Sequence, residues 1–195
     1  MNSYHKYTSP ASIDAIRSGY TKALADIDRN TRRLTPEGLR LEKGRAYIEA
    51  RDRMNALRDR FRADVNSTRS RLERQLYGAN STDPASIVAM RDAQDRAAKL
   101  TNDANAKAAW ETAQWSGDTG LQKAIAAQAS RRGWSETMAA HTTEHPTTKE
   151  LFHQLRTLPE TEGVGETALF TLGKPQGFGQ GDDNYIRSEV NQADQ

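Results

Sequence analysis

The chain of 195 residues contains no cysteine. This absence excludes disulfide bonds and thiolate-bound metal sites. The sequence also has no apolar run as long as a bilayer is thick, and Met1–Pro10 lacks the apolar segment of a secretory signal. We therefore expect a protein that does not span a membrane, has no membrane partner and stays where it is made.

Large apolar side chains are scarce, since hydrophobic residues make up 35% of the chain and aromatic residues only 7%. Charged residues account for 28%. Such a composition favours an elongated helical protein with a thin core over a thick globule. We expect partners to complete some of its surfaces.

Proline is missing between Glu37 and Asp83, and this gap marks the segment around which the chain is organised. Thr35 and Pro36 form a helix start, because Thr can cap free N–H groups and Pro fits the first helical position. Gly78 is a typical residue just beyond a helix C-terminus. The pattern predicts one helix over residues 35–77, about 60 Å long.

One apolar stripe runs along this helix, with a mean spacing near 3.6 residues. Its members are Tyr47, Ala50, Met54, Leu57, Phe61, Val65, Thr68, Leu72 and Leu76. The stripe is narrow and the remaining surface is rich in arginine, with acidic residues interspersed. A long helix of this kind must lay its stripe on another helix.

Ser9-Pro10 and Asp83-Pro84 repeat the start signal and predict helices over 9–29 and 84–115. We expect the first to fold back on the long helix as a hairpin, and the second to pack antiparallel on it through an alanine-rich stripe. Short helices follow between 118 and 158, and Glu166–Leu172 reads as one strand.

These elements predict an all-α fold, an elongated helical hairpin or bundle around the long helix. The expected organisation is a flexible arm (1–8), the hairpin or bundle (9–116), a small head of short helices (117–158) and an extended glycine-rich tail (159–195). Six of the 13 glycines lie in this tail, so we expect it to become ordered by lying on another molecule.

Charge is unevenly distributed along the chain. Residues 1–77 hold 17 of the 28 basic and 10 of the 26 acidic residues, a net charge of +7 against −5 for the remainder. This asymmetry favours either a basic half that binds partners, head-to-tail packing of copies, or two halves that lie against each other.

Two motifs resemble catalytic or metal sites. His141-Thr-Thr-Glu144-His145 matches the H-x-x-E-H pattern of a class of zinc proteases, but Pro146 disfavours helical backbone at His145, so we interpret the motif as an exposed helix end. Asp182-Asp183-Asn184 lacks the spacing of a calcium loop. We expect no enzyme activity, catalytic residue, metal, cofactor or small-molecule substrate.

Aromatic residues near helix ends and in the terminal segments are the candidate interface anchors. They are Tyr4, Tyr7, Trp110, Trp115, Trp134, Phe170, Phe178 and Tyr185. The alternative is nucleic-acid binding through the arginines of the long helix. Its candidate residues are Arg51, Arg58, Arg62 and Arg69.

The run Leu34-Thr-Pro-Glu-Gly38, followed by Ala46-Tyr-Ile48, Ala50-Arg51 and Met54–Arg58, resembles helical proteins encoded among the structural genes of tailed phages of actinobacteria. The resemblance covers residues 24–60. It implies a role in the virion or its assembly, with no catalytic residues. Internal scaffolds of such phages resemble more acidic chains, so this basic first half favours a component that stays in the particle.

The sequence therefore leads to one main hypothesis: a non-enzymatic structural protein of a multi-copy assembly, capsid- or tail-associated in a phage virion. Its expected partners are other virion proteins or copies of itself, and its expected location is the virion or the host cytoplasm. The competing hypothesis is a helical protein that binds nucleic acid or takes part in packaging.

Overall fold

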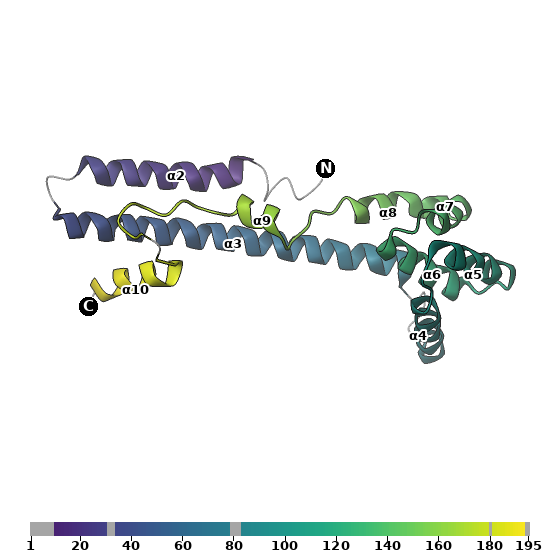
Figure 1. Cartoon of the computed structure of the whole chain (residues 1–195). Coiled ribbons are helices and arrows are strands. Elements are labelled where there is room, and N and C mark those ends of the chain that lie inside the picture. The colour runs from purple at the N-terminus through teal and green to yellow at the C-terminus, as the bar shows by residue number, and fades with distance from the viewer. Residues whose placement is uncertain (1–9, 31–33, 79–82, 180, 194–195) are drawn as a thin grey trace. The chain divides into compact units, whose positions relative to one another are not determined.

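The computed structural model describes residues 10–30, 34–78, 83–179 and 181–193, and every regular element in this part is a helix (Figure 1). The expected all-α class is confirmed. The chain divides into two compact units. Unit 1 comprises residues up to Val65 and from Glu160 onward, and unit 2 comprises Asn66–Pro159. The predicted arm, with Tyr4 and Tyr7, lies outside the described residues. Over the described part, every helix is too short or too polar to cross a membrane.

The predicted long helix is confirmed as α3 (Pro36–Tyr77). At its start, the Thr35 hydroxyl accepts a hydrogen bond from the Gly38 N–H at 3.0 Å. At its end, the Gly78 N–H donates to the Arg74 carbonyl at 2.9 Å. Of the nine residues in the predicted stripe, Leu57 and Thr68 are half-buried and the other seven are buried, so the 3.6-residue period located the buried face.

In unit 1, α2 (Pro10–Arg29) lies antiparallel to the first half of α3, as the hairpin prediction requires (Figure 1). The rings of Tyr20 and Tyr47 meet edge to face with centroids 6.0 Å apart. Near the turn, Lys43 Nζ lies 2.5 Å from Asp28 Oδ1. Aromatic contact and charge pairing together join the two helices.

The C-terminal segment also belongs to unit 1. It contains α9 (Val164–Leu169) and α10 (Asp183–Ala193), and we call residues 164–193 the strap. Its buried side chains are Glu166, Phe170, Leu172, Pro175, Phe178, Ile186 and Val190. The expectation of an extended tail that becomes ordered on another molecule is therefore corrected, because the strap packs on α2 and α3 of its own chain.

The expected strand over Glu166–Leu172 is wrong, because Glu166–Leu169 is helical in α9 and residues 170–172 form a turn and irregular chain. Helical spacing places Glu166 and Phe170 on one face, and both are buried. Buried and exposed side chains alternate, as in a strand, only from Phe170 to Leu172.

Unit 2 consists of the end of α3 and a group of shorter helices. These are α4 (Pro84–Ala98), α5 (Asp103–Trp115), α6 (Thr119–Arg132), α7 (Ser135–Glu144), the 3₁₀ helix η2 (Pro146–Thr148) and α8 (Lys149–Arg156). Helix α6 is central, and eight of the nine positions from Leu121 to Ala129 are buried, Lys123 being the exception. Alanines dominate this surface and permit close approach of neighbouring helices.

The single helix expected over 84–115 is two helices. Helix α4 ends at Ala98, and the Asn102 side chain starts α5 by accepting the Asn105 N–H at 2.9 Å. An Asn side chain that bonds to nearby backbone competes with helix continuation. Thr101-Asn102-Asp103 was the available sequence signal for this break.

The alanine stripe packs differently from the expectation. Ala93 and Ala97 of α4 join a core with Trp110 of α5 and Ala124 and Ile125 of α6, so the stripe lies on α6 and not along α3. A second cluster joins Leu76 of α3 to Ala126 and Phe152. Helices α4 and α5 therefore belong with the predicted head and not with the hairpin.

Candidate interaction site

The surface of unit 1 that binds the strap is lined by charged groups of α3. Arg62 donates two hydrogen bonds to Glu166, at 2.6 Å to Oε1 and 2.7 Å to Oε2. Glu166 is only 7% exposed. The hydrogen bonds from Arg62 lower the pKa of Glu166 by more than burial raises it. A paired, bidentate arginine of this kind fixes both the position and the orientation of α9.

The start of α10 is fixed in the same way. Asp183 accepts a hydrogen bond from the Tyr47 hydroxyl at 2.6 Å and one from Arg51 Nε at 2.8 Å. Arg51 Nη1 also donates to the Phe170 carbonyl at 2.9 Å. Burial raises the pKa of Asp183, but the bonds from Tyr47 and Arg51 outweigh it and the pKa is lowered. One arginine thus binds both ends of the link between α9 and α10.

Further along α10, the strap supplies the basic partner of one ion pair and the acidic partner of the next. Arg187 of the strap donates to Asp52 of α3, with Nη2 and Oδ1 2.6 Å apart, and Glu189 of the strap pairs with Arg40 of α3. Arg40 also lies over the Phe178 ring, 4.9 Å from its centroid. We call Arg40, Tyr47, Arg51, Asp52 and Arg62 the strap-binding face.

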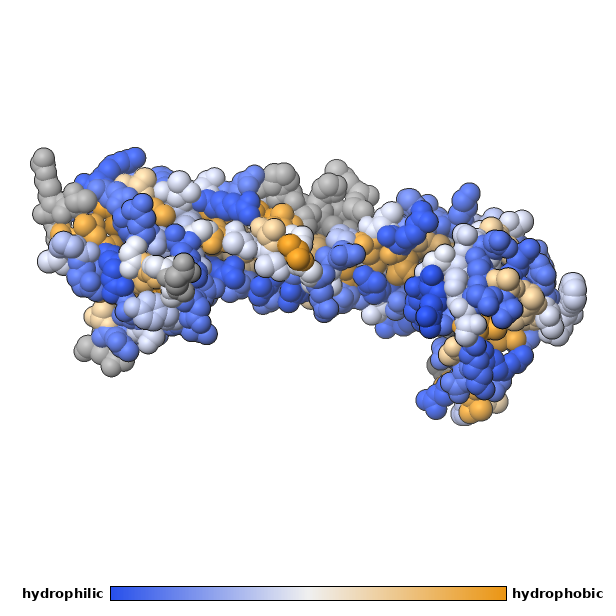
Figure 2. Space-filling view, in the orientation of Figure 1, coloured by the Kyte–Doolittle hydropathy of each residue, from blue (hydrophilic) through white to orange (hydrophobic). Residues whose placement is uncertain are grey.

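Gly44 allows the strap to approach α3. A Cβ at this position would lie 2.7 Å from Phe178 Cζ and 2.9 Å from Val190 Cγ2, which is closer than carbon atoms pack. The absence of a side chain at Gly44 therefore leaves room for two buried strap residues. Figure 2 shows polar side chains over the outer face of α3 and apolar side chains along the seam beside it.

The four arginines of the nucleic-acid hypothesis do not form a free basic stripe. Arg51 and Arg62 bind carboxylates of the strap. Arg58 is half-buried, with Nε 3.8 Å from Asp59 Oδ1, and Arg69 is half-buried. The sequence pattern indicated a charged face on α3. Two arginines of this face, Arg51 and Arg62, pair with the C-terminal segment of the same chain.

The structure places the candidate interface aromatics in different environments. Trp110, Phe170 and Phe178 are buried, and Trp134 is half-buried against the α4–α5–α6 core. Phe170 packs on Phe61, with ring centroids 5.8 Å apart. In contrast, Trp115 is 83% exposed and Tyr185 is exposed. Of the described candidates, these two are the exposed ones.

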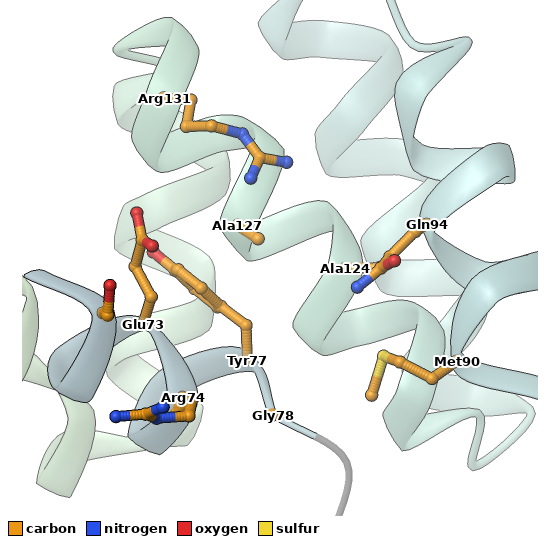
Figure 3. A pocket seen from close by; sticks show the side chains of 10 residues that line it. Glu73, Arg74, Tyr77, Gly78, Met90, Gln94, Ala124, Ala127 and Arg131 are labelled. Carbon is orange, nitrogen blue, oxygen red and sulfur yellow. The ribbon is translucent and has the colours of Figure 1, made fainter. Parts of the chain in front are cut away.

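A pocket of about 450 Å³ lies in unit 2 between the end of α3, α4 and α6 (Figure 3). The Tyr77 ring stands opposite Met90 and Gln94, Ala127 contributes to the wall, and Arg131 extends from α6 above them. Burial raises the pKa of the Tyr77 phenol. Glu73, Arg74 and Arg131 also line the pocket, so its walls combine apolar surface with two guanidiniums and a carboxylate.

A second pocket, of about 460 Å³, lies in unit 1 beside the strap. Its charged groups are largely paired: Arg51 with Asp183, Arg187 with Asp52, and Lys174 Nζ with the Gly181 carbonyl at 2.7 Å. Asp182, which was weighed as a cation ligand with Asp183 and Asn184, accepts the Tyr185 N–H at 2.8 Å. These residues serve to begin α10 and hold it on α3.

The histidine motif is part of the core of unit 2. His141 is 3% exposed, and its Nδ1 accepts a hydrogen bond from Trp110 Nε1 at 3.2 Å. Desolvation, followed by the nearby His145 and Lys123, lowers the pKa of His141 to about 4. His145 follows the last helical residue with φ −121° and ψ 69°, as Pro146 was expected to cause. The interpretation as an exposed helix end is corrected for His141, which is buried.

Within the described ranges, no group of three or more His, Cys, Asp or Glu side chains is arranged to hold a metal ion.

Asp103 has a structural role that sequence reasoning missed. Its carboxylate accepts the Glu136 and Thr137 N–H groups, each at 2.9 Å, and so caps α7 from another helix. Burial raises the pKa of Asp103, but these bonds and the Thr137 hydroxyl lower it overall.

We found no family model, curated protein or solved structure that matches this chain.

Proposed function

We propose that this protein is a non-enzymatic structural component of a multi-copy assembly, in which it contacts other proteins of the assembly or further copies of itself. The observation that carries the proposal is Trp115, an indole that ends α5 with 83% of its surface exposed. Tryptophan is a rigid, largely apolar side chain that dominates binding energy when a partner covers it. Within the same helix, Trp110 is buried. The fold therefore buries one of the two tryptophans of α5 and leaves the other exposed.

Other large apolar side chains support the same proposal. Ile87 and Val88 of α4, Val164 of α9 and Tyr185 of α10 are exposed. These residues occur in both units, and single exposed apolar residues are normal on protein surfaces, so their weight is secondary to that of Trp115. The pocket between Tyr77 and Met90 offers a further place for a partner's side chain.

The proposed assembly is a phage virion, on the strength of the resemblance over residues 24–60. In this proposal the protein is capsid- or tail-associated and is found in the particle or in the host cytoplasm during assembly. The competing role in nucleic-acid binding is less well supported, because Arg51 and Arg62 pair with Glu166 and Asp183 of the same chain.

Size-exclusion chromatography with light scattering tests the proposal, at low and high salt and with and without duplex DNA. We expect an oligomer that persists in high salt and ignores DNA. Trp115→Ala should weaken this oligomer about tenfold or more, whereas Lys99→Ala, which changes another exposed residue of unit 2, should leave it unchanged. A monomer that shifts only with DNA and loses it in salt would replace this proposal with the nucleic-acid alternative.

A further inference from the structure

We propose that the strap is exchanged between copies, so that residues 164–193 of one chain occupy the strap-binding face of a neighbouring chain. This inference rests on the proposed function, because exchange requires copies held close together. It identifies the partner of the strap-binding face as a second copy and the strap as the segment that links them.

The first support is the specificity of the strap-binding face. Along the strap, Glu166, Asp183 and Glu189 pair with arginines of α3, and Arg187 pairs with Asp52. The one reversed pair fixes the register, because a strap shifted along α3 would bring like charges together. Phe178 and Val190 fill the space left by Gly44. The face therefore selects this strap sequence, and each copy supplies one.

The second support is the way the strap is joined to the chain. Helix α8 ends at Arg156 and α9 begins at Val164, which leaves seven connecting residues that can reach about 25 Å when extended. Gly163 has φ 141°, and a Cβ there would meet only Glu160 Oε2, at 4.0 Å. Glu160, Glu162 and Gly163 are exposed. Leu158, Pro159 and Thr161 are half-buried and none of the seven residues is buried, so the connection is only lightly packed and can follow another path to a neighbouring chain.

The third support is energetic. Every contact between strap and face is the same whether the two belong to one chain or to two, so exchange alters no contact within unit 1. Exchange changes the path of the seven connecting residues and adds the free-energy cost of bringing two chains together. Inside an assembly the effective concentration of neighbouring straps is high, and this reduces the advantage of binding within one chain. Exchange would join neighbouring copies without a large apolar interface.

Cross-linking tests the proposal, because the full chain contains no cysteine of its own. One preparation carries Asp52→Cys and a second carries Arg187→Cys with a mass tag. Both positions are exposed in the structure, where the two side chains pair at 2.6 Å. The variants are mixed in equal amounts, unfolded, refolded together at high concentration and oxidised. A non-reducing gel then separates tagged heterodimers from single chains.

Random exchange between paired copies predicts that up to about half of the chains become cross-linked heterodimers. The matched control mixes Arg96→Cys with Asp118→Cys, an exposed ion pair of unit 2 at 3.3 Å that lies outside the strap, and should give background only. The double variant D52C/R187C verifies that the two positions can be bridged. If it cross-links within single chains while the mixture stays at the control level, exchange is refuted.

Light scattering of the same refolded sample separates this inference from the function on which it rests. An oligomer without heterodimer cross-links overturns strap exchange and leaves the structural role standing. A monomer overturns strap exchange and the self-association in the proposed function, but not contacts with other proteins of an assembly. An oligomer with cross-links specific to positions 52 and 187 supports both.

Discussion

The chain has few large apolar residues, and its two units are stabilised in different ways. Unit 1 is held by aromatic side chains and by charge pairs that join segments far apart in sequence, such as Arg62 with Glu166 and Arg51 with Asp183. Unit 2 is held by alanines that let α4, α5 and α6 approach closely, with Trp110 and Ile125 among them. One unit relies on a few large contacts and the other on many small ones.

This difference predicts which changes should destabilise each unit most. A large aromatic residue in unit 1 has few neighbours that can replace it, so its loss should affect the strap directly. Unit 2 depends on a neutral, buried His141 and on capped helix ends, including the α7 cap made by Asp103. The following predictions test whether the units respond independently, from the largest expected effect to the smallest.

Truncation of Phe61 should have the largest effect. Phe61 is buried against Phe170, so Phe61→Ala removes a full aromatic side chain and leaves a cavity, at a cost of about 3–5 kcal/mol. Hydrogen exchange should rise over residues 164–172 in unit 1 and stay unchanged over 121–129 in unit 2. Phe152→Ala, in the second cluster of unit 2, is the reciprocal control. Equal loosening of both regions by either variant would show that the units do not respond separately.

Acidification should weaken unit 2 before unit 1. The pKa of His141 is lowered from 6.5 to about 4 in the folded protein, so between these pH values the unfolded chain binds a proton that the folded chain does not. Stability of unit 2 therefore falls as the pH drops from about 6.5 to 4, by on the order of 3 kcal/mol. In unit 1 the pKa values of Glu166 and Asp183 are lowered, so their contributions to stability are lost only as the pH falls through the ordinary carboxyl range and below it.

Hydrogen exchange at pH 7 and pH 5, corrected for intrinsic rates, measures this difference. His141→Gln is the matching variant, because an amide can accept the Trp110 N–H but does not titrate. It should remove the acid sensitivity of residues 121–144. Acid sensitivity that survives in this variant would assign the effect to another group.

The smallest expected effect compares two glycines in helices of unit 1. Gly19 of α2 has nothing within 4 Å of a Cβ, so Gly19→Ala should stabilise by up to about 1 kcal/mol through helix propensity. Gly44→Ala gains the same propensity but forces Phe178 and Val190 to move, at a cost of about 1–3 kcal/mol. We expect net destabilisation at Gly44. Urea unfolding of both variants gives the sign, and a stabilised Gly44 variant would show that the strap does not need close contact there.

The candidate site could be predicted from sequence only in part. The arginines of α3 were recognised as a functional pattern, but their partners lie more than 100 residues away along the chain. Glu166 was assigned to a strand over Glu166–Leu172, whereas it lies in α9. Trp115 was one of eight aromatic candidates, and composition gave no means to separate it from Trp110, five residues earlier.

Local physical chemistry by itself determined the helices of this protein. Thr35 and Pro36 set the start of α3, Gly78 its end and the 3.6-residue stripe its buried face, because caps, proline and periodicity act within a few residues. Only the tertiary structure decided what each face meets. It paired α4 with α6, buried His141 beside Trp110 and laid the strap on α3. Such contacts depend on complementary shape and charge between distant segments, which no local pattern specifies.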